Sequence, residues 1–432
     1  MLAVGQSLVS LLLIIIIGFI AGYILNKIKV PGLVGMILVG LLIGPYCLNA
    51  ININVLNVSA ELRQIALIII LTRSGLNLDF ASLKKIGRPA ILMCFVPATF
   101  EIIGTTLGAH FLLDLTWFEA ILLGATLGAV SPAVVSPRMI KLIDEKRGEK
   151  HAVPKLILAG SSVDDVYTIV IFYAFLGLVK TNTFDALSVG LIPVTILGGI
   201  LMGIGVGFTI ALLFKHTNMP TIINIAIMIG VSFLMVAFEK ALDQWVDFSA
   251  LLGIMVMGMI ILFKCPKKAK NISNGYNKLW KIFEIILFVL VGASVDISYA
   301  ANNFVMSIVV LLIALAFRTV GVILCVLGTK LTWKERWFAV FAYLPKATVQ
   351  ASIGGIALAE GLACGPIILT VSVLSILITA PIGAFLIDTL GPKLLKVEND
   401  ENNVNNPPKS TNLEKEQDVS IENTLKTSQN SL

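Results

Sequence analysis

The stretch Gly160-Ser161-Ser162-Val163-Asp164-Asp165-Val166 places two adjacent carboxylates in the middle of an apolar run that extends from Leu156 to Leu178. A run of that length can cross a lipid bilayer as a helix. Ionised side chains at such a depth are costly, and they usually mark ion or proton pathways. We therefore expect Asp164 and Asp165 to form a functional site inside the membrane, and the rest of the chain to make that site tolerable.

The composition indicates a polytopic membrane protein, because 57% of the 432 residues are hydrophobic and only 13% are charged. The net charge of +6 arises from Lys and Arg in short loops between apolar runs, so it does not indicate nucleic-acid binding. The 5 cysteines and 3 histidines are scattered, without the spacing of a metal site or a disulfide framework. We expect no cofactor, and no metal other than a transported ion.

Apolar runs of about 20 residues predict an all-α membrane protein with thirteen spanning helices. Basic residues gather after the odd-numbered spans, for example Lys84, Lys85 and Arg88 after the third, which predicts an N-terminus outside the cell and a C-terminus in the cytoplasm. The polar composition of 396–432 predicts a disordered cytoplasmic tail after a transporter domain over 1–395. The expected spans lie near 5–26, 31–48, 60–78, 88–112, 117–137, 151–178, 187–214, 221–240, 248–263, 277–297, 302–329, 335–360 and 366–389.

Weak internal similarity recurs at an offset of about seven spans. Leu115-Thr116-Trp117 returns as Leu331-Thr332-Trp333, the segment around Glu101 matches the segment around Arg318, and 75–80 matches 294–299. An odd number of spans reverses the direction of the second copy. We therefore expect two inverted repeats, about 1–178 and 221–389, joined by a linker helix over 187–214, an arrangement typical of secondary transporters.

Two spans in corresponding positions contain a proline at mid-membrane: the fifth has Val130-Ser131-Pro132, and the twelfth has Pro345-Lys346. Proline lacks a backbone N–H and clashes with the preceding turn, so each helix should kink or unwind there. The freed carbonyls must face protein or water, where they can bind a hard monovalent cation. If the broken helices cross, Lys346 would offset the negative ends of the half-helices.

The remaining buried charges suggest partners for the aspartates. Glu101 and Arg318 occupy equivalent positions in the two repeats, and we expect a mainly structural ion pair between them. Lys346 is expected to pair with either Asp164 or Asp165. Two adjacent carboxylates cannot both ionise freely without a cation, so protons and a cation would compete for the same oxygens.

Other charged residues give weaker indications. Arg73, Glu284 and Asp296 are expected to line an entrance or to satisfy helix ends, and Glu239 and Glu360 to lie at the membrane interface.

The motifs Asp164-Asp165, Gly128-Ala129-Val130-Ser131-Pro132-Ala133-Val134-Val135 and Leu344-Pro345-Lys346-Ala347-Thr348-Val349-Gln350 resemble those of the monovalent cation:proton antiporter superfamily. The likeness is closest to the sodium/proton exchangers with an Asp-Asp motif, in the branch that includes the animal NHA exchangers, and it covers about 1–395. It implies an NhaA-like antiporter fold that has a dimerisation domain and a mobile core domain, with broken helices crossing at the site. It also implies a homodimer and elevator-like alternating access.

The resemblance also assigns site residues. Asp165 is implied as the main carboxylate for cation and proton, Asp164 as its neighbour, and Ser131 and the Val130 carbonyl as further ligands. Many electrogenic relatives carry lysine where this chain has Arg318. Because arginine stays charged at any physiological pH, the motif alone does not establish an electrogenic two-proton cycle.

The sequence thus predicts a sodium (or lithium)/proton antiporter of a prokaryotic plasma membrane, serving pH homeostasis, and not an enzyme. A potassium/proton antiporter is the alternative, since both use carboxylates and carbonyls. A sodium-coupled organic anion symporter would not need the Asp-Asp pair or the embedded Lys346. An intramembrane aspartyl protease would need its aspartates on separate helices.

Overall fold

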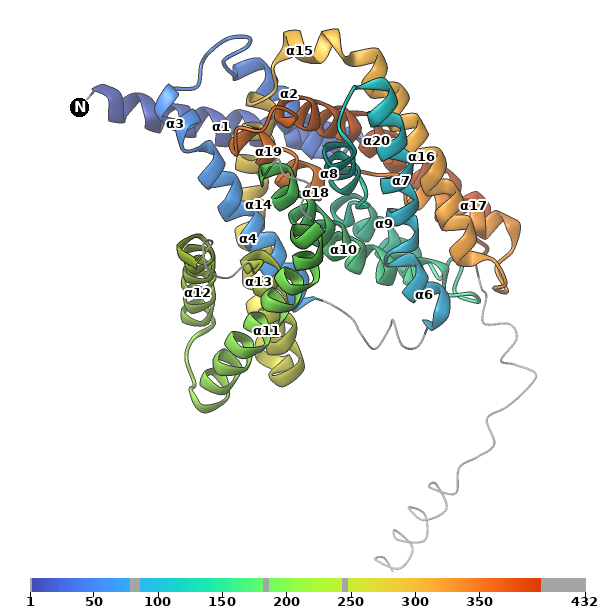
Figure 1. Ribbon diagram of the computed structural model, residues 1–432. Coiled ribbons are helices and arrows are strands. Elements are labelled where there is room, and N and C mark those ends of the chain that lie inside the picture. The colour runs from blue at the N-terminus through green and yellow to red at the C-terminus, as the bar shows by residue number, and fades with distance from the viewer. Residues whose placement is uncertain (1, 78–85, 182–185, 243–247, 398–432) are drawn as a thin grey trace, which may run out of the picture. The chain divides into compact units, whose positions relative to one another are not determined.

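A computed structural model describes residues 2–77, 86–181, 186–242 and 248–397, and every regular element within these ranges is helical (Figure 1). Met1–Lys396 form one compact unit. The match of 75–80 with 294–299 falls partly outside the described residues, as does the expected tail from residue 398 onward.

Within the ranges that the structure describes, eight helical segments are long and apolar enough to cross a membrane. The expected fourth and fifth spans are each divided between two helices, and each of the other eleven ranges also corresponds to a helix or to an interrupted series of helices. A count of thirteen crossings stays a prediction. The eight segments are Gln6–Lys27, Arg88–Leu112, Trp117–Asp144, Val153–Lys180, Val194–His216, Thr221–Leu242, Phe304–Val326 and Gly365–Leu394.

The helices pack in two groups, with most contacts inside a group and few between the groups. The first group consists of α1 (Leu2–Lys27), α2 (Gly32–Ile43), α4 (Ser59–Leu76), α11 (Ala186–His216), α12 (Thr221–Leu242), α13 (Ala250–Lys264) and α14 (Pro266–Ala293). The second consists of α6 (Arg88–Met93), α7 (Val96–Leu112), α8 (Trp117–Leu127), α9 (Pro132–Asp144), α10 (Val153–Thr181), α16 (Phe304–Val326), α17 (Trp333–Ala342), α18 (Thr348–Ile353), α19 (Ile356–Ala359) and α20 (Gly365–Leu394). The short helices α3 (Ile53–Asn57) and α15 (Ile297–Asn302) lie between spans.

Small residues allow close helix contacts within the first group, as is usual between membrane helices. A Cβ atom on Gly40 of α2 would lie 2.0 Å from the carbonyl oxygen of Val289 on α14, and one on Gly292 would lie 2.2 Å from that of Ile37. The backbones of α2 and α14 therefore meet at a distance that only glycine permits.

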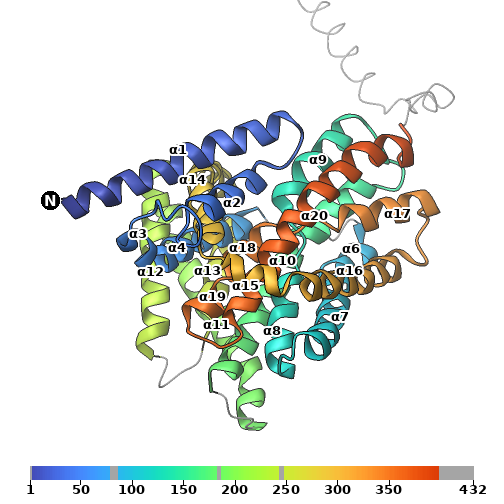
Figure 2. The same ribbon diagram turned by 90° about the horizontal axis from the view of Figure 1, so that it is seen from above.

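Both proline-containing spans are interrupted where the sequence predicted. The chain leaves α8 after Leu127 and enters α9 at Pro132, and it leaves α17 after Ala342 and enters α18 at Thr348. The two breaks touch, since the backbone N–H of Ser131 donates to the carbonyl of Pro345 at 2.8 Å. Discontinuous helices thus cross inside the second group, where α18 and α8 lie next to α10 (Figures 1 and 2).

The recurring Leu-Thr-Trp segments have the same local structure in both halves. Thr116 caps α8 and Thr332 caps α17, and in each case a glutamate three residues later, Glu119 or Glu335, completes a reciprocal capping box. The helices that carry Glu101 and Arg318, α7 and α16, pack closely together. Equivalent positions therefore carry equivalent structure, although the repeat boundaries stay a prediction.

Candidate functional site

Asp164 and Asp165 lie in the middle of α10, with relative exposures of 0% and 7%. The Oδ2 atom of Asp164 accepts hydrogen bonds from the backbone N–H of Val130 at 2.9 Å and from Nη2 of Arg318 at 3.0 Å. In the described part of the chain, no protein group donates to Oδ1 of Asp164 or to Oδ1 of Asp165. One aspartate is thus anchored to the first break, and both retain a buried oxygen that can accept a proton or a cation.

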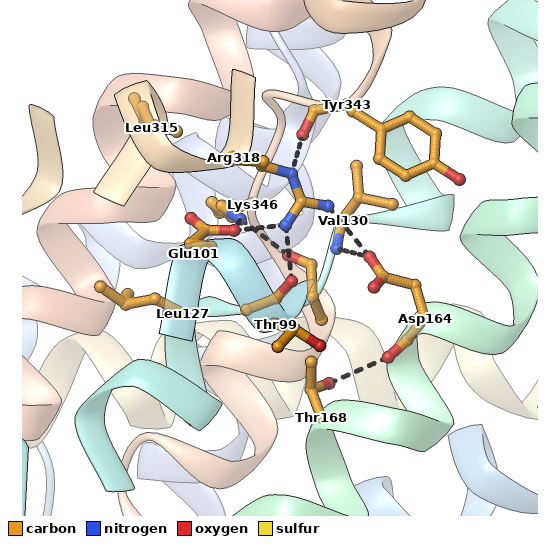
Figure 3. Close-up of polar contacts among 12 residues, drawn as sticks. Thr99, Glu101, Leu127, Val130, Asp164, Thr168, Leu315, Arg318, Tyr343 and Lys346 are labelled. Atoms are coloured by element: carbon orange, nitrogen blue, oxygen red, sulfur yellow. Dashed lines mark hydrogen bonds and ion pairs between the residues drawn. The ribbon is translucent and has the colours of Figure 1, made fainter. Parts of the chain in front are cut away.

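Arg318 connects four elements of the second group (Figure 3). Its Nη1 donates to Oε2 of Glu101 and, at 2.6 Å, to the carbonyl of Gly128, while its Nε donates to the carbonyl of Tyr343 at 2.6 Å. The expected Glu101–Arg318 pair is therefore present, and the same guanidinium also holds Asp164. The planar fork of arginine makes this bridging possible.

The partner of Lys346 differs from the one predicted from the sequence. Its Nζ lies 2.5 Å from Oε2 of Glu101 and 3.2 Å from the carbonyl of Ala129, so the expected pairing with Asp164 or Asp165 is wrong. The reason is geometric, because Glu101 on α7 lies between the two cations and Arg318 already occupies Asp164. The backbone N–H of Lys346 is fixed in turn by Oγ1 of Thr379 on α20, at 2.9 Å.

Gln350 is a structural member of the site that the charged-residue search missed. Its Nε2 donates to the carbonyls of Leu127 and Ala129 at 3.2 and 3.0 Å, and its Oε1 accepts from the N–H of Ala347 at 2.9 Å. One amide therefore satisfies backbone groups on both breaks, which unwound backbone inside a membrane requires. Gln350 stands in the quoted motif, but its reach across to α8 depends on the crossing of the helices.

The buried ionisable side chains around Asp164 and Asp165 form a cluster whose positive and negative charges do not balance. Counted as ionised, Glu101, Asp164 and Asp165 exceed Arg318 and Lys346 by one negative charge, and all five side chains are at least nine-tenths buried. An uncompensated charge in a medium of low dielectric constant is costly, so this cluster favours one proton or one monovalent cation.

The helix break supplies further oxygen atoms near Asp164. The Oγ atom of Ser131 is buried and has no partner among the described residues, and the neighbouring Val130 N–H is the donor to Asp164. Within the described residues no three His, Cys, Asp or Glu side chains gather as they would around a metal ion. A hydroxyl, carbonyls and two carboxylates form the donor set that a hard monovalent cation prefers.

The more peripheral charges have structural partners. Asp296 caps α15, the guanidinium of Arg73 lies 5.7 Å from the centre of the Trp280 ring, Glu239 accepts from the N–H of Ala250, and Glu360 pairs with Lys180 at 2.8 Å. Glu239 and Glu360 also line a cavity of about 440 Å³ between α4, α10, α12 and α19. This cavity reaches Tyr173, eight residues beyond Asp165 on the same helix.

Comparisons with known proteins agree with this architecture. The profile of the family described as "Sodium/hydrogen exchanger, transmembrane" matches residues 11–391. The human sodium/hydrogen exchanger 9B2 is 34% identical over 415 residues, covering 91% of this chain and 76% of that protein, and human exchanger 9B1 is 32% identical over 413 residues, covering 90% and 79%.

A solved structure shows the same fold at lower sequence identity. The sodium proton antiporter MjNhaP1 from Methanocaldococcus jannaschii superposes with a TM-score of 0.75 at 21% identity, covering 91% of this chain and 98% of that one. The fold predicted from the crossed helices is therefore confirmed. The family match over most of the sequence and the two human relatives show that this chain is a multi-pass membrane protein of the sodium/hydrogen exchanger family, within the cation:proton antiporter superfamily.

Proposed function

We propose that this protein exchanges sodium (or lithium) for protons across a membrane, and that the two substrates compete for the Asp164–Asp165 site. The observation that carries the proposal is the buried cluster with one excess negative charge and unpartnered carboxylate oxygens. Because that charge must be neutralised before the cluster can move through a low-dielectric environment, either a proton or a cation has to be bound during each crossing.

The roles of the residues follow from their contacts. Asp165 has no hydrogen bond to its carboxylate among the described residues, so it is the group that exchanges its proton for the cation. Asp164 contributes its free Oδ1, and Ser131 Oγ with the Val130 carbonyl completes the ligand set. Arg318, Glu101 and Lys346 hold the surrounding geometry, and Pro132 and Pro345 keep the breaks open.

We further propose a stoichiometry of one proton for one monovalent cation. Arg318 cannot release a proton at physiological pH, and its bond to Asp164 favours the ionised form of that carboxylate over the ionised form of Asp165. One carboxylate charge is then left to be neutralised, so each substrate carries the same charge across and the cycle is electroneutral.

The orientation and assembly of the protein are proposed on separate grounds. The basic loops favour an external N-terminus and a cytoplasmic C-terminus. Two separately packed helix groups are what a fixed scaffold and a moving core would require, and a homodimer formed by the first group would provide the fixed part. A prokaryotic plasma membrane remains the proposed location.

The proposal is tested in proteoliposomes that contain a pH-sensitive dye, with sodium, lithium or potassium added to the outside. We expect sodium and lithium to change the internal pH, and Asp165→Asn to abolish the change. A response to potassium alone would favour potassium/proton exchange instead. An imposed membrane potential should leave the rate unaltered, and a rate that follows the potential would contradict the one-to-one stoichiometry.

A further inference from the structure

Each capping box at the start of a broken helix contacts the other half of the chain. In the first repeat, Glu119 of α8 lies beside the thiol of Cys364, the residue that precedes α20. In the second repeat, both carboxylate oxygens of Glu335 on α17 lie 3.0 Å from Nδ1 of His151, two residues before α10. In the predicted repeats the two contacts occupy equivalent positions, because α10 and α20 are the last helices of the two repeats.

The two equivalent contacts differ in one chemical respect. A thiol is a weak, neutral hydrogen-bond donor at neutral pH, whereas an imidazole ordinarily changes its charge between pH 5 and 8. His151 is 17% exposed and Glu335 is 10% exposed, so the pair is largely buried and can still exchange protons with water. Of the two capping boxes described above, only that of α17 contacts a side chain that changes its charge near neutral pH. This contact lies at the end of the core where α10 and α17 begin.

α17 contacts α10 at three successive positions along the two helices. The His151–Glu335 contact holds the first turn, the hydroxyl of Tyr343 lies against Gly160 in the middle, and Arg318 joins Asp164 to the Tyr343 carbonyl at the break. Between these positions lies a continuous apolar interface that includes Val153, Leu156, Ile157, Phe338 and Ala339. A shift at the start of α17 is therefore passed to the segment that carries Lys346.

We propose that His151 is a positioning residue for exchange: through Glu335, the charge on its imidazole sets how firmly α17 is held against α10, and thereby the geometry of the cation site. The inference rests on the function proposed above. The cationic imidazole forms an ion pair with Glu335 and the neutral imidazole does not, so the added constraint depends on the charge of the imidazole.

The charged groups on the neighbouring elements do not replace Glu335 in this role. Lys155 pairs with Glu149 at 3.7 Å, Arg147 pairs with Glu145 at 2.9 Å, and Arg336 donates to the Thr329 carbonyl. Among the described residues, Glu335 is the carboxylate within ion-pair distance of His151. The other charged groups near this end of the core are the basic Lys146, Lys150, Lys330, Lys334, Lys393 and Lys396, and the acidic Asp144 and Asp388, of which Asp388 pairs with Arg138 at 3.1 Å.

The test compares the full-length protein with His151→Gln, His151→Lys and the matched control Cys364→Ala in proteoliposomes. We expect His151→Gln to raise the sodium concentration for half-maximal exchange about threefold to fivefold near pH 6, with a ratio that approaches one near pH 8.5. His151→Lys, which keeps a cation at both pH values, should restore the acidic behaviour. Cys364→Ala should follow the unmodified protein at every pH.

Thermal unfolding in detergent tests the contact without transport. The melting temperature of His151→Gln should fall below that of the unmodified protein near pH 6, and the two should converge near pH 8.5. A difference that does not vary with pH, or a His151→Lys variant that behaves like His151→Gln, would overturn the inference. Absence of sodium-driven exchange in the unmodified protein would instead overturn the proposed function, and the unfolding result would still stand.

Discussion

At the scale of single residues, the two adjacent aspartates differ in their surroundings. Asp164 accepts hydrogen bonds from Val130 and Arg318, whereas no group among the described residues donates a hydrogen bond to the carboxylate of Asp165. Sequence spacing does not reveal this difference, because adjacent helical residues are about 100° apart and either could face the break. One aspartate is thus a structural anion, and the other is the group free to exchange its proton.

This difference predicts opposite effects of the two neutralising substitutions on stability. Asp164→Asn leaves the buried guanidinium of Arg318 without one of its two carboxylates, so we expect a loss of about 3–5 kcal/mol in the free energy of unfolding. Asp165→Asn removes an unpaired buried charge, and the melting temperature should stay level or rise.

This contrast is measured by heating each variant in detergent and then determining, by size-exclusion chromatography, how much folded protein remains at each temperature. Each variant serves as the matched control for the other, since the residues are adjacent and the substitution is the same. Equal destabilisation by the two variants would be inconsistent with the assigned roles.

At the scale of helices, proline and the internal repeat predicted both breaks, and the capping threonines recur at the predicted equivalent positions. Glu101 and Arg318 were paired correctly by that equivalence. The partner of Lys346 and the contribution of Gln350 were not predictable, because they depend on how α7 and α18 are rotated about their axes and on where the helices cross. Periodicity gives the spacing of residues along one helix, not the distance between side chains on two.

The contact of α10 with α17 can be tested by a compensating pair of substitutions. A Cβ on Gly160 would lie 2.0 Å from the Tyr343 hydroxyl and 2.8 Å from the Cβ of Met93, so Gly160→Ala should displace both neighbours, lowering the melting temperature and the exchange rate. Tyr343→Phe removes that hydroxyl at the loss of one long bond, 3.4 Å, to the Met93 carbonyl.

The double variant Gly160→Ala/Tyr343→Phe should recover part of the exchange rate and stability lost in Gly160→Ala, because the closer of the two clashes is removed and the contact with Met93 is left. Gly177→Ala is the control on the same helix, because nothing lies within 4 Å of a Cβ added there. Additive losses in the double variant would show that the two residues do not act through this contact.

At the scale of the whole molecule, two helix groups with few mutual contacts place the five charged side chains of the Asp164–Asp165 site, Glu101, Asp164, Asp165, Arg318 and Lys346, within one group. The composition and the alternating loop charges predicted a polytopic transporter, and the family match confirms its class. The division into two groups was implied by the resemblance alone, since hydropathy identifies spans and carries no information on which spans pack together. If the second group moves as a unit, the cluster crosses the membrane intact, and its net charge decides what must accompany it.

The most direct test of this account is the number of protons released when sodium binds to the purified protein in weakly buffered detergent solution. Competition at a cluster with one excess negative charge predicts close to one proton per protomer, measured at a pH where Asp165 is protonated, and none in Asp165→Asn. Release of two protons would contradict the charge count. Sodium binding without any proton release would contradict competition at Asp164–Asp165, which is the central claim.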